Sequence, residues 1–222
     1  MSRFARGRRP TIVTPPLHLQ APSLTCDLVA SAPRTVDLPR AERAVRELLL
    51  ALGEDPTRDG LRDTPARVAR AFAEMTGGMR ADPGEHLARV FAEDTDDLVL
   101  VTDIAFHSLC EHHLLPFSGR ASIAYVPAGG RIVGLSKLAR TVEVFARRPQ
   151  VQERLTAQIA DAIVEHLVPE AVGVLVTSEH SCMKVRGVRQ AEAAMTTTAW
   201  RGRWKFDSAR RAEVAPLLRD SR

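Results

Sequence analysis

The sequence predicts an α+β fold in which helices come first and a largely antiparallel sheet, interrupted by a pair of helices, follows. Two patterns carry this prediction. Apolar residues recur at helical spacing in the first part of the chain, whereas from residue 97 alternating segments flank two long helical ones. Strands and helices do not alternate one by one, and the sequence has no glycine-rich phosphate loop, so a parallel βαβ arrangement is not expected.

Three helices are expected within residues 37–96, which we interpret as an N-terminal helical region. Each begins with a capping residue, and the second has proline in its first turn, as is typical of a helix start. The expected bounds are Asp37 to Gly53, Thr64 to Gly77, and a short helix from Asp82. The side chains expected to face inward are Ala41, Val45, Leu48, Leu49, Val68, Phe72, Met75, Leu87, Val90 and Phe91.

Residues 97–222 are interpreted as the catalytic domain, built on a sheet. Strands are expected where apolar residues alternate with polar ones or β-branched residues gather. These segments are 98–106, 120–125, 172–176, 183–188 and 195–204. Helices are expected near 136–146 and 151–167, separated by Pro149, and a closing helix near 207–218.

Residues 1–36 are interpreted as a mobile, basic, proline-rich tail, because they sustain no hydrophobic period. No apolar run in the sequence reaches the roughly 18 residues needed to cross a bilayer. Charges and prolines stand where a signal peptide would have its apolar segment. We therefore expect a cytoplasmic protein with no membrane partner.

The net charge and the number of cysteines limit the classes of function that the chain could have. The formal net charge of +4 comes from 31 basic and 27 acidic residues, a mixed surface that does not indicate nucleic acid binding. The three cysteines, Cys26, Cys110 and Cys182, cannot form a disulfide framework. Widely spaced cysteines in a cytosolic protein suggest metal binding or catalysis.

The segment Cys110-Glu111-His112-His113 is the sharpest local feature, because a cysteine and a histidine three residues apart can bind one metal ion. Cys182, in His180-Ser181-Cys182, completes a Cys-His-Cys set. Three protein ligands with one open position describe a catalytic zinc site, whereas a structural site would need four. The alternative is that these are small buried thiols and core histidines, but His112, His113 and His180 are three of the seven histidines, and each lies within three residues of Cys110 or Cys182.

His112 and His180 are the candidate acid/base residues beside this metal. Zinc lowers the pKa of bound water toward about 7, and a nearby imidazole can transfer protons near neutrality. A zinc-bound water with a histidine beside it is suited to the hydrolytic opening of a heterocyclic ring. Zinc nucleobase deaminases also use His and Cys ligands, but their H-x-E and P-C-x-x-C signature is absent from the sequence.

A second group of residues is suited to a nucleotide. Several cations could bind a triphosphate, and a helix start adds free backbone N–H groups. The cations are Arg67, Lys137, Arg140, Lys184 and Arg186, and Ser136 stands beside Lys137 at the helix start. In Gln152-Glu153, the carboxylate could accept the N1–H and N2–H donors of guanine. The alternative for each is a solvated surface position.

Four long motifs and one earlier segment together resemble the GTP cyclohydrolase I family. They are CEHHLLPF at 110–117, GRIVGLSKLAR at 130–140, RRPQVQERL at 147–155, EHSCMKVRGV at 179–188 and, near the start, LGEDPTRDGLRDTPARVA. Their order and spacing also match, and the resemblance covers roughly residues 40–207.

The resemblance implies a hydrolase of cyclic amidine C–N bonds that opens the imidazole ring of GTP. Water activated by zinc on the Cys-His-Cys set would attack guanine C8, His112 would protonate the ring, and His180 would assist. Formate would leave, and the ring would reclose as 7,8-dihydroneopterin triphosphate, the first step of tetrahydrofolate and pterin biosynthesis. Ser136 would lie near the sugar chemistry. The residues implied around guanine and the triphosphate are Leu135, Val151, Gln152, Glu153, Arg67, Lys137, Arg140 and Arg186.

The resemblance also implies a fold and an assembly. The fold is the tunnelling fold, an antiparallel sheet with a helix pair on one face, here preceded by N-terminal helices. The assembly is a homodecamer of two rings of five, with active sites at subunit boundaries. Ala193 and Met195 depart from the usual Ser and Thr of the family, and Ser122 stands where many bacterial members have histidine, which leaves packing behind the site and catalytic efficiency open.

Two other functions fit the sequence less well. Another tunnelling-fold enzyme, such as a nitrile reductase or a pterin synthase, would lack CEHH combined with a distant H-x-C. A non-catalytic zinc protein that binds nucleic acid should have a closed metal site and stacking aromatic residues, but the chain has one tyrosine and two tryptophans.

Overall fold

The computed structural model describes residues 35–219, so the predicted tail lies almost entirely outside the described residues. The helices are α1 (Leu38–Ala51), α2 (Thr64–Met75), α3 (Gly84–Leu87), α4 (Leu135–Ala146), α5 (Gln152–Leu167), α6 (Ser181–Lys184) and α7 (Ser208–Arg219), with short 3-10 helices η1 (Gly77–Arg80) and η2 (Arg203–Lys205). The strands are β1 (Val90–Ala92), β2 (Val99–Cys110), β3 (Pro116–Val126), β4 (Arg131–Val133), β5 (Pro149–Gln150), β6 (Ala171–His180) and β7 (Ala194–Gly202).

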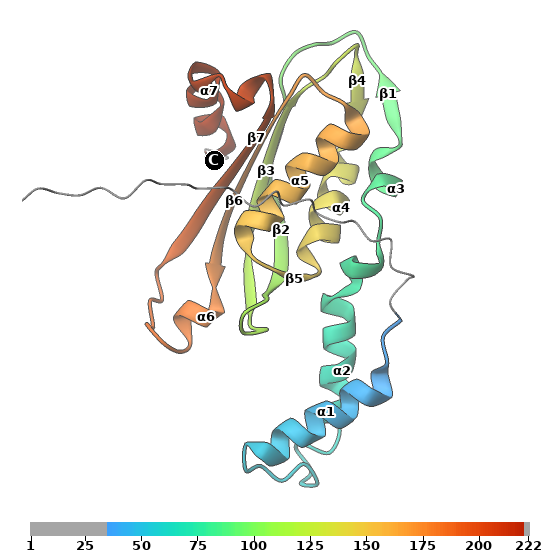
Figure 1. Cartoon of the computed structure of the whole chain (residues 1–222), viewed down its shortest axis with the longest axis vertical. Helices are drawn as coiled ribbons and strands as arrows, with labels where there is room; N and C mark the ends of the chain where they lie inside the picture. The colour runs from blue at the N-terminus through green and yellow to red at the C-terminus, as the bar shows by residue number, and fades with distance from the viewer. Residues whose placement is uncertain (1–34, 220–222) are drawn as a thin grey trace, which may run out of the picture. The chain divides into compact units, whose positions relative to one another are not determined.

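The main sheet has the strand order β5-β2-β3-β6-β7. The long strands β2, β3, β6 and β7 are antiparallel to their neighbours, and only the two-residue β5 pairs in parallel, with the end of β2. Helices α4 and α5 lie across one face of this sheet (Figure 1). The predicted α+β class, with an antiparallel sheet and a helix pair on one face, is confirmed.

The larger core lies between the sheet and the helix pair. Alternate residues of β3, such as Phe117, Ile123 and Tyr125, point into it and meet the apolar stripes of α4 and α5. The side chains of Tyr125, Phe117 and Leu155 are fully buried there. This core supports the ends of β2, β3 and β6, where the candidate site lies.

The opposite face of the sheet is covered at one end by α7 (Figure 1). Ala124 and Val126, the alternate residues of β3, pack there with Trp204, Val214 and Leu218. The alternation of β3 therefore serves two cores, which explains why its last four residues, 123–126, are all apolar.

Helix α1 begins as predicted, but Thr64 is the first residue of α2 and not its cap, and α3 begins only at Gly84. Neither α2 nor α3 has a capping hydrogen bond from the side chain of its N-cap residue. The carboxylate of Asp37 accepts a hydrogen bond from the backbone N–H of Arg40 at 2.9 Å, which caps α1, and α2 has proline in its first turn. The inward position predicted for Leu48 is wrong, because this side chain remains 58% exposed although α1 packs against α2.

Two further local predictions are wrong. Val90 and Phe91 were expected in the third helix but form β1, are exposed, and pair with β4, so they belong to a two-stranded sheet. The segment 183–188 is not a strand, because α6 occupies Ser181–Lys184 and no regular element follows before β7. Among the described residues, no helix is long and apolar enough to cross a bilayer.

Candidate metal centre and active site

The motif after β2 forms a tight turn that determines where its side chains point. The carbonyl oxygen of Cys110 accepts hydrogen bonds from the N–H groups of His113 and Leu114, and the N–H of Cys110 donates to the carbonyl of Leu115. Leu114 has φ of 53°, a left-handed conformation that is uncommon outside glycine. This reversal places Cys110 and His113 on the same side of the turn.

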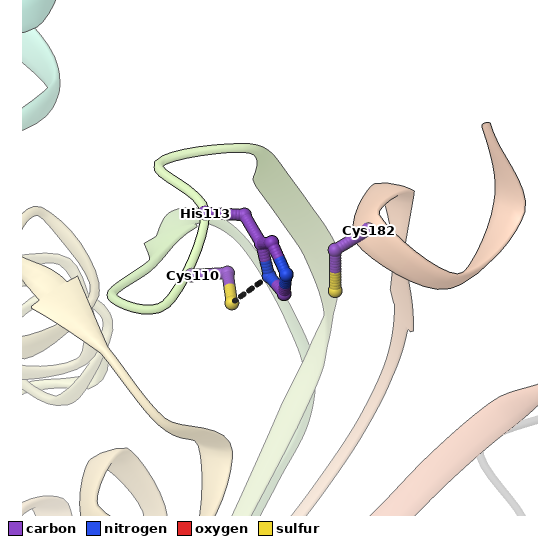
Figure 2. Close-up of side chains that lie close together, drawn as sticks. All are labelled: Cys110, His113 and Cys182. Atoms are coloured by element: carbon purple, nitrogen blue, oxygen red, sulfur yellow. Dashed lines mark hydrogen bonds between the residues drawn. The ribbon is translucent and has the colours of Figure 1, made fainter. Parts of the chain in front are cut away.

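The third member of the predicted set comes from the end of β6. Phe117, just beyond the turn, pairs in register with His180, so the residues that follow His180 lie beside the turn. The ligand atoms of Cys110, His113 and Cys182 all lie within 4.8 Å of one another, and Figure 2 shows the three side chains converging. Cys110 Sγ lies 3.8 Å from His113 Nδ1.

The three side chains fit a zinc ion. Zinc binds thiolate sulfur at about 2.3 Å and imidazole nitrogen at about 2.0 Å in a tetrahedral arrangement, so its ligand atoms stand roughly 3.5 Å apart. Burial raises the pKa of the Cys182 thiol, and the adjacent Cys110 raises it further. A divalent cation between the sulfurs would favour both thiolates. No other group of three potential ligands gathers among residues 35–219.

A cavity of about 380 Å³ adjoins the cluster. Two of the cluster residues, Cys110 and Cys182, line it, together with His112, His180 and Glu153. The remaining lining residues are Gln150, Val151, Gln152, Met183, Ala193, Ala194 and Met195. The structure therefore brings together most of the predicted catalytic and guanine-binding residues. The two departures from the family pattern, Ala193 and Met195, also lie here, whereas Ser122 is buried in β3.

His112 lies beside the cluster but outside the set of three. Its Nδ1 is 3.9 Å from Cys110 Sγ, and its ring meets that of His113 edge to face, with centroids 6.3 Å apart. The side chain is exposed and lines the cavity. It can therefore reach a molecule bound in the cavity.

His180 is held from two sides. Its ring stacks on Phe117 with centroids 4.5 Å apart and planes 7° from parallel. Its Nε2 lies 2.9 Å from the side-chain oxygen of Gln152 and 3.2 Å from Ser178 Oγ. Burial lowers the pKa of His180, and the Glu153 carboxylate opposes this by raising it.

Gln152 and Glu153 begin α5 but have different surroundings. Gln152 is 1% exposed, whereas Glu153 is exposed at the cavity. The Gln152 amide nitrogen lies 3.0 Å from the carbonyl oxygens of both Val176 and Met195, and 3.1 Å from Thr197 Oγ1. Its side chain is thus fully engaged within the protein, while the Glu153 carboxylate is free to meet a ligand.

The predicted cations do not all gather at this cavity. Arg186 Nη1 lies 3.5 Å from His113 Nε2, so Arg186 borders the metal cluster. Arg67, on α2, forms an ion pair with Asp63 at 3.1 Å. Arg140 lines a different cavity of about 530 Å³ between α2, β2 and α4. The α4 residues Leu135, Ser136, Lys137 and Arg140 and the α2 residue Arg67 do not line the cavity beside the cluster.

Sequence reasoning missed several residues that support the site. Phe117 and Ser178 hold His180, and an ion pair between Arg154 and Glu111 ties the metal-binding turn to α5. Phe117 lies within the CEHHLLPF motif and Arg154 within RRPQVQERL, so membership of a motif was the available signal. Ser178 carried no such signal, since its role depends on the pairing of β6 with its neighbours.

The family model described as GTP cyclohydrolase I matches residues 41–219. The chain belongs to the GTP cyclohydrolase I family. This is a family of enzymes, and the resemblance inferred from the motifs is confirmed.

Similar proteins named GTP cyclohydrolase 1 come from several bacteria. The one from Rhodopirellula baltica is 59% identical over 183 residues, which are 82% of this chain and 80% of the relative. The one from Mycobacterium ulcerans is 56% identical and covers 85% of this chain and 94% of its own length. The one from Bacillus subtilis is 55% identical and covers 82% and 95%.

Among solved structures, the chain resembles a crystal structure of the archaeosine synthase QueF-Like in the apo form. The TM-score is 0.40 and the sequence identity 19%, over 47% of this chain and 93% of that one.

Proposed function

We propose that the protein is a zinc-dependent GTP cyclohydrolase I. It would open the guanine imidazole ring of GTP by hydrolysis, release formate and reclose the product as 7,8-dihydroneopterin triphosphate, the first step of tetrahydrofolate and pterin biosynthesis. The observation that carries this proposal is the convergence of Cys110, His113 and Cys182 beside a cavity lined by two further histidines and a glutamate.

The Cys-His-Cys cluster is the proposed metal site. A zinc ion held there supplies Lewis-acid activation of water, the chemistry that ring hydrolysis requires. Cys110 and His113 come from one hydrogen-bonded turn and Cys182 from the first turn of α6, so the paired ends of β3 and β6 set the spacing of the proposed ligands. Three protein ligands leave one position open, as in catalytic zinc sites.

Guanine is proposed to bind next to the cluster through the start of α5. The Glu153 carboxylate can accept two hydrogen bonds from the N1–H and N2–H edge of the base. The backbone of Val151 and Gln152 supplies the remaining contacts, because the Gln152 side chain is already engaged. This arrangement would direct the imidazole half of the base toward the metal.

Two histidines are proposed to move protons. His112 lines the cavity beside the turn and would protonate the imidazole ring as it opens. His180, on the β6 side, would serve as a further acid/base during ring opening and reclosure. Ser136, at the start of α4, is proposed to act near the sugar rearrangement, in a site completed by another subunit.

The triphosphate is proposed to bind cations from more than one subunit. Arg186 borders the cluster of its own chain, whereas Arg67, Lys137 and Arg140 lie away from it and would face the site of a neighbour. The outer edge of β7 has no partner strand within the described chain, and β5 covers only the last two residues of β2. Such edges favour pairing between copies. Both observations support self-association, which we propose to be the decamer of two five-membered rings.

The direct test is incubation of the purified protein with GTP. Release of formate, together with a pterin that fluoresces after oxidation, is expected from the wild type and not from Cys182→Ser. A wild-type protein that binds zinc and GTP but releases no formate would contradict the proposal. A small-molecule substrate also fits a cytoplasmic location and no nucleic acid partner.

A further inference from the structure

We propose that Gln152 and Ser178 form a buried clamp that holds His180 in a single tautomer, with the hydrogen on Nε2 and the lone pair on Nδ1. Gln152 is thus a positioning residue, and its side chain acts through His180 instead of binding guanine. The catalytic consequence rests on the proposed function, whereas the clamp is a property of the free protein.

The orientation of the Gln152 amide is dictated by backbone. Its nitrogen lies 3.0 Å from the carbonyl oxygens of both Val176 and Met195, which can only accept hydrogen bonds. An amide turned by 180° would place its oxygen against these two oxygens. The NH₂ group must therefore face β6 and β7, and the amide oxygen must face His180.

The amide oxygen then determines the tautomer. It can only accept, and it lies 2.9 Å from His180 Nε2, so that nitrogen must carry a hydrogen. Ser178 Oγ donates its one hydrogen to the same oxygen at 2.6 Å, so toward His180 Nε2, 3.2 Å away, it can also only accept. Both neighbours select the Nε2–H form. Nδ1 keeps the lone pair that a proton acceptor needs.

Burial makes this arrangement rigid. Gln152 and Ser178 are each 1% exposed, so a lost hydrogen bond would leave a buried polar group without a partner. The stacked ring of Phe117 sets the plane of the imidazole. If the imidazole were turned over within that plane, a carbon atom would lie where Nε2 meets the amide oxygen, and the hydrogen bond would be lost.

The test uses the zinc-loaded protein with ¹⁵N-labelled histidine. Protonated and unprotonated imidazole nitrogens differ strongly in ¹⁵N chemical shift, and the spectrum of His180→Gln identifies the His180 signals among the seven histidines. Spectra are recorded about two pH units above the ordinary histidine pKa of about 6.5, where the ring is neutral. The wild type is expected to show only the Nε2–H form of His180.

Gln152→Met removes the amide at nearly constant volume and should give a mixture of tautomers. Gln158→Met is the matched control on α5, because the Gln158 amide oxygen accepts from Gln150 instead of contacting His180, and it should keep the wild-type tautomer. Ser178→Ala is a smaller change that can be used if Gln152→Met fails to fold. It should shift part of the His180 population to the other tautomer. An Nδ1–H form in the wild type, or an unchanged tautomer in both Gln152→Met and Ser178→Ala, would overturn the clamp.

Kinetics separate positioning from substrate binding. Gln152→Met is expected to lower kcat by about 10- to 100-fold while the Kd for GTP changes by less than about threefold, since an acid/base group that is misplaced loses most of its typical contribution. A higher Kd for GTP with a normal kcat would mean that the Gln152 side chain binds guanine, and it would overturn the positioning role. If the wild type released no formate, the proposed function would fail, but the ¹⁵N spectra would still decide the clamp.

Discussion

The imidazole of His180 lies parallel to the ring of Phe117, with centroids 4.5 Å apart. Phe117 is fully buried, so it joins the main core to a proposed acid/base residue. Phe117→Leu should lower the free energy of unfolding by roughly 1–2 kcal/mol and should also lower turnover, because the imidazole loses the surface that fixes its plane. Denaturant unfolding and formate release measured on the same preparation check both effects.

Phe106→Leu is the control for this change. Phe106 is buried in the same core and meets Phe117 edge to face, with centroids 6.0 Å apart, but it does not stack on His180. It should lose similar stability and keep its turnover. Equal losses of turnover in the two variants would mean that core stability, and not the position of His180, limits the reaction.

His112→Ala should keep zinc bound and still lose activity. His112 lies outside the cluster of three ligand atoms but lines the cavity, so its removal should cost proton transfer and leave the metal in place. The expected loss is about 10² to 10⁴ fold for a general acid. Zinc content and formate release from one preparation decide the role: protein without zinc would make His112 a ligand, and near-normal turnover would leave it without a catalytic role.

Arg186→Ala should weaken the binding of GTP far more than the binding of guanosine, because a phosphate anchor matters only when phosphates are present. Arg189→Ala, which removes the same charge from the same exposed segment, is the control and should change both affinities little. Calorimetric Kd values for the two ligands provide the comparison. Equal weakening of GTP and guanosine by Arg186→Ala would place Arg186 away from the phosphates.

The protein should become less stable in alkali because of Tyr125, the only tyrosine of the chain. Burial raises the pKa of Tyr125 above its ordinary value, although its hydroxyl oxygen accepts a hydrogen bond from Val133 N–H. Above about pH 10 the unfolded chain loses this proton while the folded chain retains it, so the free energy of unfolding should fall as the pH rises through that range.

Denaturant unfolding at about pH 9 and about pH 11 measures this fall, and Tyr125→Phe should show a smaller one. Other groups that titrate in alkali are present in both proteins and cancel in the comparison. The same fall in both proteins would show that Tyr125 does not cause it.

Local sequence patterns predicted that Cys110 and His113 lie together and that Asp37 caps α1. Cys110 and His113 are three residues apart, and the capping role of Asp37 depends on its own helix, so short-range chemistry was sufficient. The burial of Gln152 could not be predicted in this way. It results from β6 and β7 meeting α5, a contact between segments distant in the sequence.

The wrong predictions have the same origin. Val90 and Phe91 are compatible with a short helix, but pairing with β4 draws them into a strand. The apolar residues of 183–188 resembled a strand, although Val185 and Val188 remain exposed at 67% and 65%. Hydrophobic periodicity does not reveal which partner a segment meets.

The central claim is that the Cys-His-Cys cluster holds the zinc on which GTP hydrolysis depends. Cys110→Ser and Cys182→Ser should each lose both zinc and activity, because the remaining pair of ligands cannot hold the ion. Full zinc occupancy in either variant would contradict the ligand assignment.

The most direct measurement is formate release from GTP while zinc is returned to chelated wild-type protein. Formate release should be absent without metal, should rise in proportion to zinc and should level off at one zinc per chain, while Cys182→Ser should stay inactive throughout. Full activity in protein shown to contain no metal, or zinc-restored activity in Cys182→Ser equal to that of the wild type, would contradict the claim.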